Sequence, residues 1–319
     1  MAGGIHHITC VSGAPQRNVD FYCGVLGLRL VKKTVHFDNA RVYHLYYGDE
    51  TGTPGSLITF FPFPDEEDRG RHGAGSVSAV HFCVPEDSTA YWEARLRRLG
   101  IKAGTWRERF GDPVLEFEDH EGLCLELAAT AAAGRRAGWR GGDVPPRHAV
   151  RFIAGAALSV RRPEPSIELL TTVFGLAIGA EEAGRTRLLF PGDALGMHLD
   201  VVHMPDGPDA APVPLEGVLP EIGTVNHLAM GPATRSEQLD IRGLLAGAGL
   251  QVTGVKDRRY FQSIYTLDPA GIRLEVATGE PGFLVDESAA ALGTTLQLPP
   301  WLESERPVYE RLLPPIDAS

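Results

Sequence analysis

Two short stretches, Val-Asn-His-Leu-Ala-Met at residues 225–230 and Gly-Ile-Arg-Leu-Glu-Val at 271–276, decide how the chain is organised. Both are apolar and short, so each predicts a buried strand. Each also carries one good metal-ligand side chain, His227 or Glu275, where a hydrophobic residue would suit a core strand better. A matching strand near the N-terminus, Ile-His-His-Ile-Thr-Cys at 5–10, supplies another histidine.

The composition indicates a globular protein with a large core. The chain has 319 residues, 43% of them hydrophobic, which suffices for two ordinary domains or one large one. Its net charge is −11, with acidic and basic residues well mixed. This pattern argues against nucleic acid or an anionic membrane as the main partner.

Location can also be predicted from the sequence. The chain contains no run of about 18 apolar residues, so no membrane-spanning helix is expected. The N-terminus lacks the basic and apolar regions of a secretory signal. The four cysteines form no CxxC pair, and three lie in apolar strand-like segments. Reduced thiols in a cytoplasmic protein are therefore expected rather than disulfides.

Four segments of the chain follow the same plan, an internal repeat. Each begins with an apolar strand, continues with a helix that ends at a glycine, and closes with strands that form a hairpin. The segments are about 5–62, 78–129, 153–202 and 223–278, with helices at about 15–26, 88–99, 164–174 and 235–248. One βαβββ unit cannot bury its sheet face alone, but two units side by side form an eight-stranded half-open barrel, or cup. The predicted fold is α+β: four tandem βαβββ modules that form two half-open barrel cups.

The connectors predict a division into domains. Residues 131–150 are rich in glycine, alanine and arginine and are typical of a linker. We therefore expect a first domain at 1–130 and a second at 151–278, each with two modules. A proline-containing tail, 279–319, is expected to lie along the surface.

The repeat resembles the vicinal oxygen chelate superfamily, which includes glyoxalases, fosfomycin-resistance proteins and type I extradiol dioxygenases. Four tandem modules, three of them opening on a histidine, carry this resemblance over essentially the whole chain. Within the superfamily the chain is most similar to ring-cleaving hydroquinone dioxygenases. The stretches that carry this closer likeness are 4–9, 19–22, 26–35, 43–49, 296–303 and 312–315.

Aligning the four repeats gives a candidate metal site. The opening-strand positions are His7, His81, Ala157 and His227, and the closing-strand positions are Thr59, Glu126, Asp200 and Glu275. The resemblance implies that a metal draws its ligands from these positions of two partnered modules. Pairing the first module with the fourth gives His7, His227 and Glu275, with Thr59 as a fourth, non-ligating position. Two histidines and one carboxylate are the ligand set of mononuclear non-haem Fe(II) oxygenases, which keep positions open for oxygen and substrate.

Pairing the second module with the third gives His81, Glu126 and Asp200, with Ala157 in place of the second histidine. This set could bind a second metal. Glu126 and Asp200 could instead pair with arginines or accept backbone hydrogen bonds, because buried carboxylates need partners. The sequence leaves both alternatives open.

The resemblance implies three catalytic residues around the first set. Tyr265 corresponds to a tyrosine near the substrate oxygen, Arg258 to an arginine of the hydroquinone enzymes, and His6 to an acid/base histidine. From the residues alone, Tyr265 could also be a core aromatic, and Arg258 could be a solvated charge beside Arg259. Strand alternation points His6 away from His7, so an acid/base role would need a twist or bulge at the start of the strand.

Two further residues are predicted to bind substrate. Thr9 shares a strand face with His7, and Asn226 precedes His227. Asn226 stands where the resembled enzymes have a histidine; asparagine can hydrogen-bond a hydroxyl but cannot shuttle a proton near pH 7. The remaining histidines are interpreted as surface or internally satisfied groups, namely His36, His44, His120, His148, His198 and His203.

The expected function is a ring-cleaving dioxygenase that uses Fe(II), or Mn(II), with O2 and a hydroquinone- or catechol-like aromatic. A homo-oligomer is compatible with the sequence. One alternative is a glyoxalase-type isomerase or lyase that uses another divalent metal and no O2. The other is a non-catalytic protein that binds a metal or small molecule. Three predicted ligands favour the dioxygenase, because glyoxalase cups commonly use four and Thr59 takes the fourth place.

Overall fold

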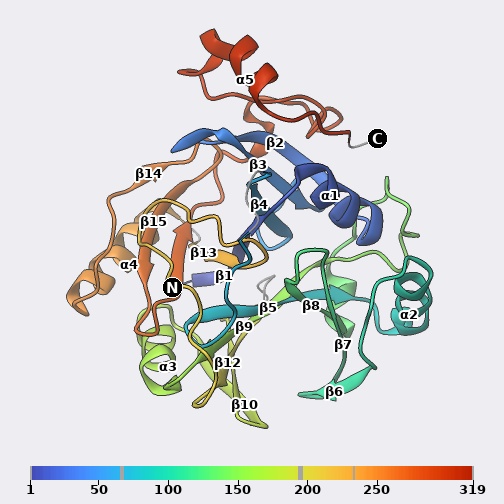
Figure 1. Ribbon diagram of the computed structural model, residues 1–319. Helices are drawn as coiled ribbons and strands as arrows, with labels where there is room; N and C mark the ends of the chain where they lie inside the picture. The colour runs from blue at the N-terminus through green and yellow to red at the C-terminus, as the bar shows by residue number, and fades with distance from the viewer. Residues whose placement is uncertain (1, 65–67, 193–196, 233, 318–319) are drawn as a thin grey trace.

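The computed structural model describes residues 2–64, 68–192, 197–232 and 234–317. Residues 1, 318 and 319, at the ends of the expected first domain and tail, lie outside this range. The described chain is built around two eight-stranded sheets, one above the other in Figure 1. No helix among the described residues is long and apolar enough to cross a membrane, and the four cysteines are unpaired.

The first sheet joins the first and last modules of the chain. Its strands, in spatial order, are β14 (Lys256–Asp257), β15 (Gln262–Leu267), β16 (Arg273–Ala277), β13 (Val225–Pro232), β1 (Ala2–Ser12), β4 (Leu57–Pro62), β3 (Asn39–Gly48) and β2 (Arg29–His36). The central pair, β1 and β13, is antiparallel, and each of these strands runs parallel to the closing strand of its own module.

The second sheet repeats this order with the two middle modules. Its strands are β10 (Ala177–Glu182), β11 (Arg185–Leu189), β12 (His198–His203), β9 (Phe152–Val160), β5 (Ser76–Val84), β8 (Cys124–Ala129), β7 (Asp112–Glu118) and β6 (Arg107–Arg109). The prediction of four βαβββ modules in two cups is confirmed. Each cup takes one module from each half of the chain, and the division into domains at residues 131–150 stays a prediction.

One helix per module covers the flanks of the sheets, with α1 and α2 on one side of Figure 1 and α3 and α4 on the other. They are α1 (Pro15–Val19), continued by a π-helical turn η1 (Asp20–Val25), α2 (Thr89–Arg98) after the 3-10 turn η2 (Glu86–Ser88), α3 (Pro163–Thr172) and α4 (Arg235–Gly247). The glycines predicted to stop them, Gly27, Gly100, Gly175 and Gly249, have φ of +69°, +72°, +78° and +80°. Glycine adopts this left-handed conformation at a helix end without a Cβ penalty.

The C-terminal segment lies on the outside of the first sheet, beyond β2 (Figure 1). It contains the short helices η4 (Phe283–Val285), η5 (Glu303–Glu305) and α5 (Arg306–Leu312); another, η3 (Ala131–Arg135), lies in the linker. Lys32 of β2 is fully buried and donates to Asp286 (2.6 Å) and Glu287. This buried ion-pair cluster ties the segment to the first module.

Candidate active site

Strand register brings the three predicted ligands to one face of the first sheet. Across the antiparallel pair β1–β13, His7 lies opposite Ala229 and Thr9 opposite His227. Across the parallel pair β13–β16, Ala229 lies opposite Glu275. Residues at even spacing or directly opposite share a face. The first and last modules therefore meet as predicted, although His7 and His227 are far apart in sequence.

The ligand atoms of these side chains lie close together in a buried space. The Nε2 atoms of His7 and His227 are 3.3 Å apart, and Glu275 Oε2 is 2.9 Å from His227 Nε2 and 3.4 Å from His7 Nε2. Their residues are 1%, 5% and 0% exposed, respectively. We call these three residues the triad.

Neighbouring groups determine which nitrogen of His7 carries the proton. The Thr278 carbonyl can only accept, so it receives the Nε2–H of His6 (3.1 Å). Burial lowers the pKa of His6 to about 3, so this ring is neutral and its Nδ1 is an acceptor. That Nδ1 receives the Nδ1–H of His7 at 2.9 Å. In the neutral tautomer with this Nδ1–H, the Nε2 atom of His7, which faces His227 and Glu275, carries a lone pair.

The same reasoning applies to His227. Arg273 Nη1, a donor only, faces Asn226 at 2.9 Å, so the atom that it meets is the amide oxygen. This oxygen also receives the Nδ1–H of His227 at 2.8 Å. Burial lowers the pKa of His227 to about 4, although Glu275 opposes the shift. The ring is neutral, and its Nε2 also carries a lone pair.

The carboxylate completes the set. Ser263 donates to Oε1 of Glu275, whereas Oε2 is buried with no donor. The Nε2 atoms of the two histidines and this carboxylate oxygen thus converge. The triad could hold a divalent cation, and hydrogen bonds to the outer atoms of ligands are typical of metal sites.

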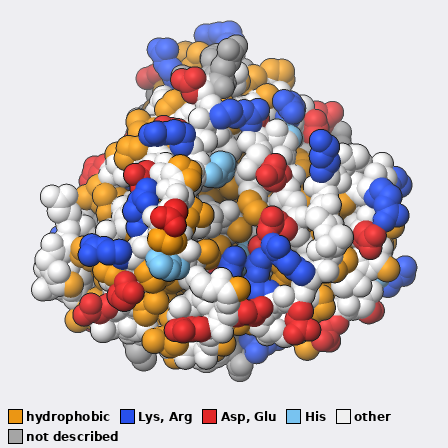
Figure 2. Space-filling view, turned by 60° about the horizontal axis from the view of Figure 1, so that its bottom comes forward, with side chains coloured by type: hydrophobic (Ala, Val, Ile, Leu, Met, Phe, Trp, Pro, Cys, Tyr) orange, Lys and Arg blue, Asp and Glu red, His pale blue; other side chains and the backbone are white. Residues whose placement is uncertain are grey.

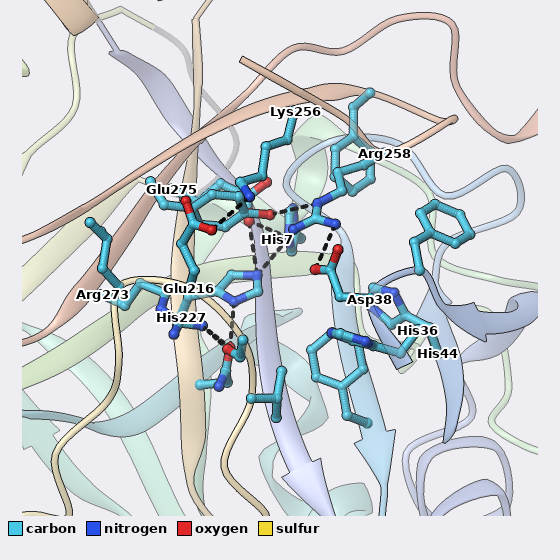
Figure 3. A pocket seen from close by; sticks show the side chains of 18 of the residues that line it. His7, His36, Asp38, His44, Glu216, His227, Lys256, Arg258, Arg273 and Glu275 are labelled. Carbon is cyan, nitrogen blue, oxygen red and sulfur yellow. Dashed lines mark hydrogen bonds and ion pairs between the residues drawn. The ribbon is translucent and has the colours of Figure 1, made fainter. Parts of the chain in front are cut away.

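The triad lies in the wall of a cavity of about 300 Å³ (Figure 3). This volume is at the lower end for small-molecule sites. The rings of Phe61 and Phe261 supply apolar lining, and residues 215–218, in the segment between β12 and β13, form another part of the wall. The cavity is therefore suited to a small, flat ligand with polar groups.

Arg258 and Tyr265 also line this cavity and contact each other. Arg258 Nε donates to the Tyr265 hydroxyl at 3.2 Å, and its Nη1 donates to Asp38 at 3.1 Å. Burial, followed by the charge of Glu275, raises the pKa of Tyr265. Arg258 is thus a paired side chain of the cavity wall rather than a solvated charge. Tyr265 lines the same cavity as the triad.

The other three predicted residues hold different places. Asn226 lines the cavity, but His6 and Thr9 are not among the lining residues. A register shift between Ile5 and His7 in β1 supplies the expected bulge, and it places His6 behind His7, next to a second cleft on the outer surface. Thr9 is fully buried and shares a hydrogen bond of 2.8 Å with Thr59. The acid/base role of His6 and substrate contacts by Thr9 and Asn226 stay predictions.

In the second cup, arginines pair with both carboxylates of the predicted set; a second metal there stays a prediction. Arg187 Nε and Nη2 donate to the two oxygens of Asp200 at 2.8 and 3.0 Å, and Arg109 pairs with Glu126. His198, interpreted from the sequence as a surface or internally satisfied group, is 4% exposed, and its Nε2 lies 3.1 Å from His81 Nδ1. Figure 2, turned toward this sheet, shows Lys and Arg side chains around a hollow near its centre. His81, His198 and Asp200 lie close enough to share a metal. The Asp200 carboxylate, however, already accepts hydrogen bonds from guanidinium groups.

Sequence reasoning missed several residues of the cavity. His36, Asp38 and His44 line it from β2, β3 and the turn between them. Register counting could have found His44: its neighbour on the same face, Tyr46, lies opposite Thr59, the closing-strand position of the first module. Nothing comparable marks His36 and Asp38, because they lie where the strand pairing ends.

Comparisons with known proteins agree with this architecture. Residues 4–127 match the model of the Glyoxalase/Bleomycin resistance protein/Dioxygenase superfamily. The "Putative ring-cleaving dioxygenase MhqO" of Bacillus subtilis (strain 168) is 39% identical over 98% of this chain and 96% of its own. The chlorohydroquinone/hydroquinone 1,2-dioxygenase of Sphingobium indicum is 33% identical over 94% of this chain and 92% of its own. A crystal structure described as a putative dioxygenase from Bacillus subtilis superposes with a TM-score of 0.91 at 38% identity, covering 100% of this chain and 98% of the other.

Proposed function

Because the chain belongs to the Glyoxalase/Bleomycin resistance protein/Dioxygenase superfamily and is a dioxygenase, we propose that it uses Fe(II) to cleave a hydroquinone- or catechol-like ring with O2. His7, His227 and Glu275 are the proposed metal ligands, and Mn(II) is the alternative ion. The partners in this proposal are the small aromatic substrate and O2, and the location is the cytoplasm.

The observation that carries the proposal is the convergence of three ligand atoms in a buried space. The two Nε2 atoms and Oε2 of Glu275 lie within 3.4 Å of one another, while the other polar atom of each side chain is held by a neighbouring group of the protein. A divalent cation would fit among these three ligand atoms. The ligand types and their number suit Fe(II) that keeps positions open.

The fourth closing-strand position supports three ligands rather than the four of a glyoxalase-type cup. The Thr59 hydroxyl shares hydrogen bonds with Thr9 at 2.8 Å and with His44 Nε2 at 2.9 Å. The hydroxyl is therefore already held by two groups of the protein. This geometry favours the oxygenase over the isomerase or lyase.

The protein side chains would bind and orient the ring. Bound Fe(II) would supply the redox chemistry with O2. The raised pKa keeps the Tyr265 hydroxyl protonated, so it can donate to a ring oxygen. Arg258 fixes the direction of that hydroxyl, because its Nε–H occupies one lone pair. Phe61 and Phe261 limit the water in the cavity, which strengthens these polar contacts.

Anaerobic reconstitution with Fe(II), followed by oxygen-electrode assays with hydroquinone and catechol, tests the proposal. We expect stoichiometric metal and O2 uptake dependent on the aromatic. The adduct of methylglyoxal with a thiol serves as the competing substrate. Turnover of that adduct without O2 uptake on any dihydroxy aromatic would refute the dioxygenase proposal.

A further inference from the structure

Most polar side chains that line the cavity are already paired within the protein. The pairs are Arg258 with Asp38, Lys256 with Glu216, His44 with both Tyr46 and Thr59, and His227 with Asn226. Groups held in this way are less available to a ligand, because a new hydrogen bond must replace an existing one.

His36 is the exception among the imidazoles of the cavity. It ends β2, is 8% exposed, and its buried Nδ1 has no hydrogen-bond partner among the described residues. Its ring packs edge-on against Phe61, with the centroids 4.5 Å apart and an interplanar angle of 79°. Phe61 thus holds the imidazole in place without satisfying its polar atoms.

An unpartnered imidazole in a buried wall destabilises the fold unless something binds to it. Burial lowers the pKa of His36 to about 4, so at neutral pH the ring has one N–H and one lone pair. Its Nδ1 is the atom sealed from solvent. Orphaned N–H groups are rarer in proteins than under-used acceptors, so the proton belongs on Nε2. His36 therefore offers a hydrogen-bond donor to the cavity.

Figure 3 shows where such a donor would act: His36 lies on the opposite side of the cavity from the triad. An aromatic ring with one oxygen at the triad would extend toward this wall. In a catechol, the second oxygen is adjacent to the first and stays on the triad side. In a hydroquinone, it is at the far end of the ring.

We propose that His36 is a specificity-determining residue that donates a hydrogen bond to the ring oxygen farthest from the triad. The inference rests on the proposed function, because the triad must hold the first oxygen. The hydrogen bond from His36 favours ligands whose para substituent accepts a hydrogen bond over ligands with an apolar para substituent of the same size. Hydroquinone and 4-methylphenol form such a matched pair of ligands.

The test is anaerobic binding to the Fe(II)-loaded protein, measured by calorimetry with hydroquinone and with 4-methylphenol. One hydrogen bond corresponds to roughly tenfold in affinity. We expect the unaltered protein to prefer hydroquinone by about this factor. His36→Phe should abolish the preference, with 4-methylphenol bound as tightly as before or more so, whereas His36→Gln, which keeps a donor, should retain part of it.

His203→Phe is the matched control, because His203 is exposed on β12 of the other sheet; this variant should keep the full preference. Retention of the preference in His36→Phe, or its absence from the unaltered protein, would overturn the role of His36. Either result leaves the proposed function intact if hydroquinone still drives O2 uptake. Failure of both hydroquinone and catechol to drive uptake would instead refute the proposed function.

Discussion

Replacing Asn226 with alanine tests whether the partners of the triad prepare it for a metal. Asn226 is 4% exposed, and its side-chain oxygen accepts the Nδ1–H of His227 at 2.8 Å. Without this acceptor, the proton of His227 can move to Nε2 and be donated to Glu275, 2.9 Å away. A metal must then displace that proton. A buried hydrogen bond of this kind accounts for about 1–3 kcal/mol, so we expect metal affinity to fall roughly 10- to 100-fold.

The matched variant is Asn226→Asp, which keeps an oxygen in the same place. Aspartate can accept from both His227 and Arg273, so metal affinity should stay near that of the unaltered protein or rise. The assay is an anaerobic competition titration of Fe(II) against a chelator, repeated with Mn(II), and unfolding curves of the metal-free proteins report any loss of fold. Equal metal affinity in the alanine and aspartate variants would refute the proposed control of the His227 tautomer.

Three further changes separate the roles of the two cups and of His6. His227→Ala should abolish stoichiometric metal binding while His81→Ala leaves it intact; the reverse result would move the site to the second cup. His6→Phe removes an acceptor behind the triad and should weaken metal binding in the same titration; full metal content with lost turnover would favour the acid/base role instead. Arg187→Met leaves buried Asp200 with only the longer contact to Arg185, at 3.3 Å, and should lower the free energy of unfolding at pH 7 by up to about 3–5 kcal/mol, less when combined with Asp200→Asn. Burial disfavours the charge of Asp200, but Arg187 outweighs it and holds its pKa well below the usual range. This pairing therefore stabilises the protein above about pH 4, and the deficit of Arg187→Met should shrink as the pH falls below it; a deficit independent of pH would contradict the assignment.

Much of the architecture could be predicted because it repeats. Glycines at the helix ends and strands that open on a histidine recur with every module, so the alignment of modules predicted both the cups and the convergence of the triad. The arginine partners of Glu126 and Asp200 were anticipated as a class, since a buried carboxylate needs a donor. Which arginines would serve could not be predicted. Arg187 lies on the strand next to that of Asp200 and Arg109 lies two strands from that of Glu126, and only the fold determines the register of these strands.

The remainder depends on local departures from regular structure. Alternation along β1 predicts that His6 faces away from His7, but the bulge between Ile5 and His7 lets the two Nδ1 atoms meet at 2.9 Å. The partner that determines the tautomer of His6, the carbonyl of Thr278, comes from the end of the last module. His36 lies at the end of its strand, where the pairing with β3 shifts register. None of these contacts leaves a periodic signal in the sequence.

The two cups share a strand order and differ in how each compensates its buried carboxylates. In the second cup, Arg187 and Arg109 bring positive charge to Asp200 and Glu126, so the protein itself supplies the cation. In the first cup, Arg273 is near Glu275 in sequence, yet its Nη1 donates to Asn226 and to a backbone carbonyl instead. Burial of a carboxylate without a cation destabilises a fold. In the proposed function the first cup takes its cation from solution, while Arg273, through Asn226, orients the ligand His227.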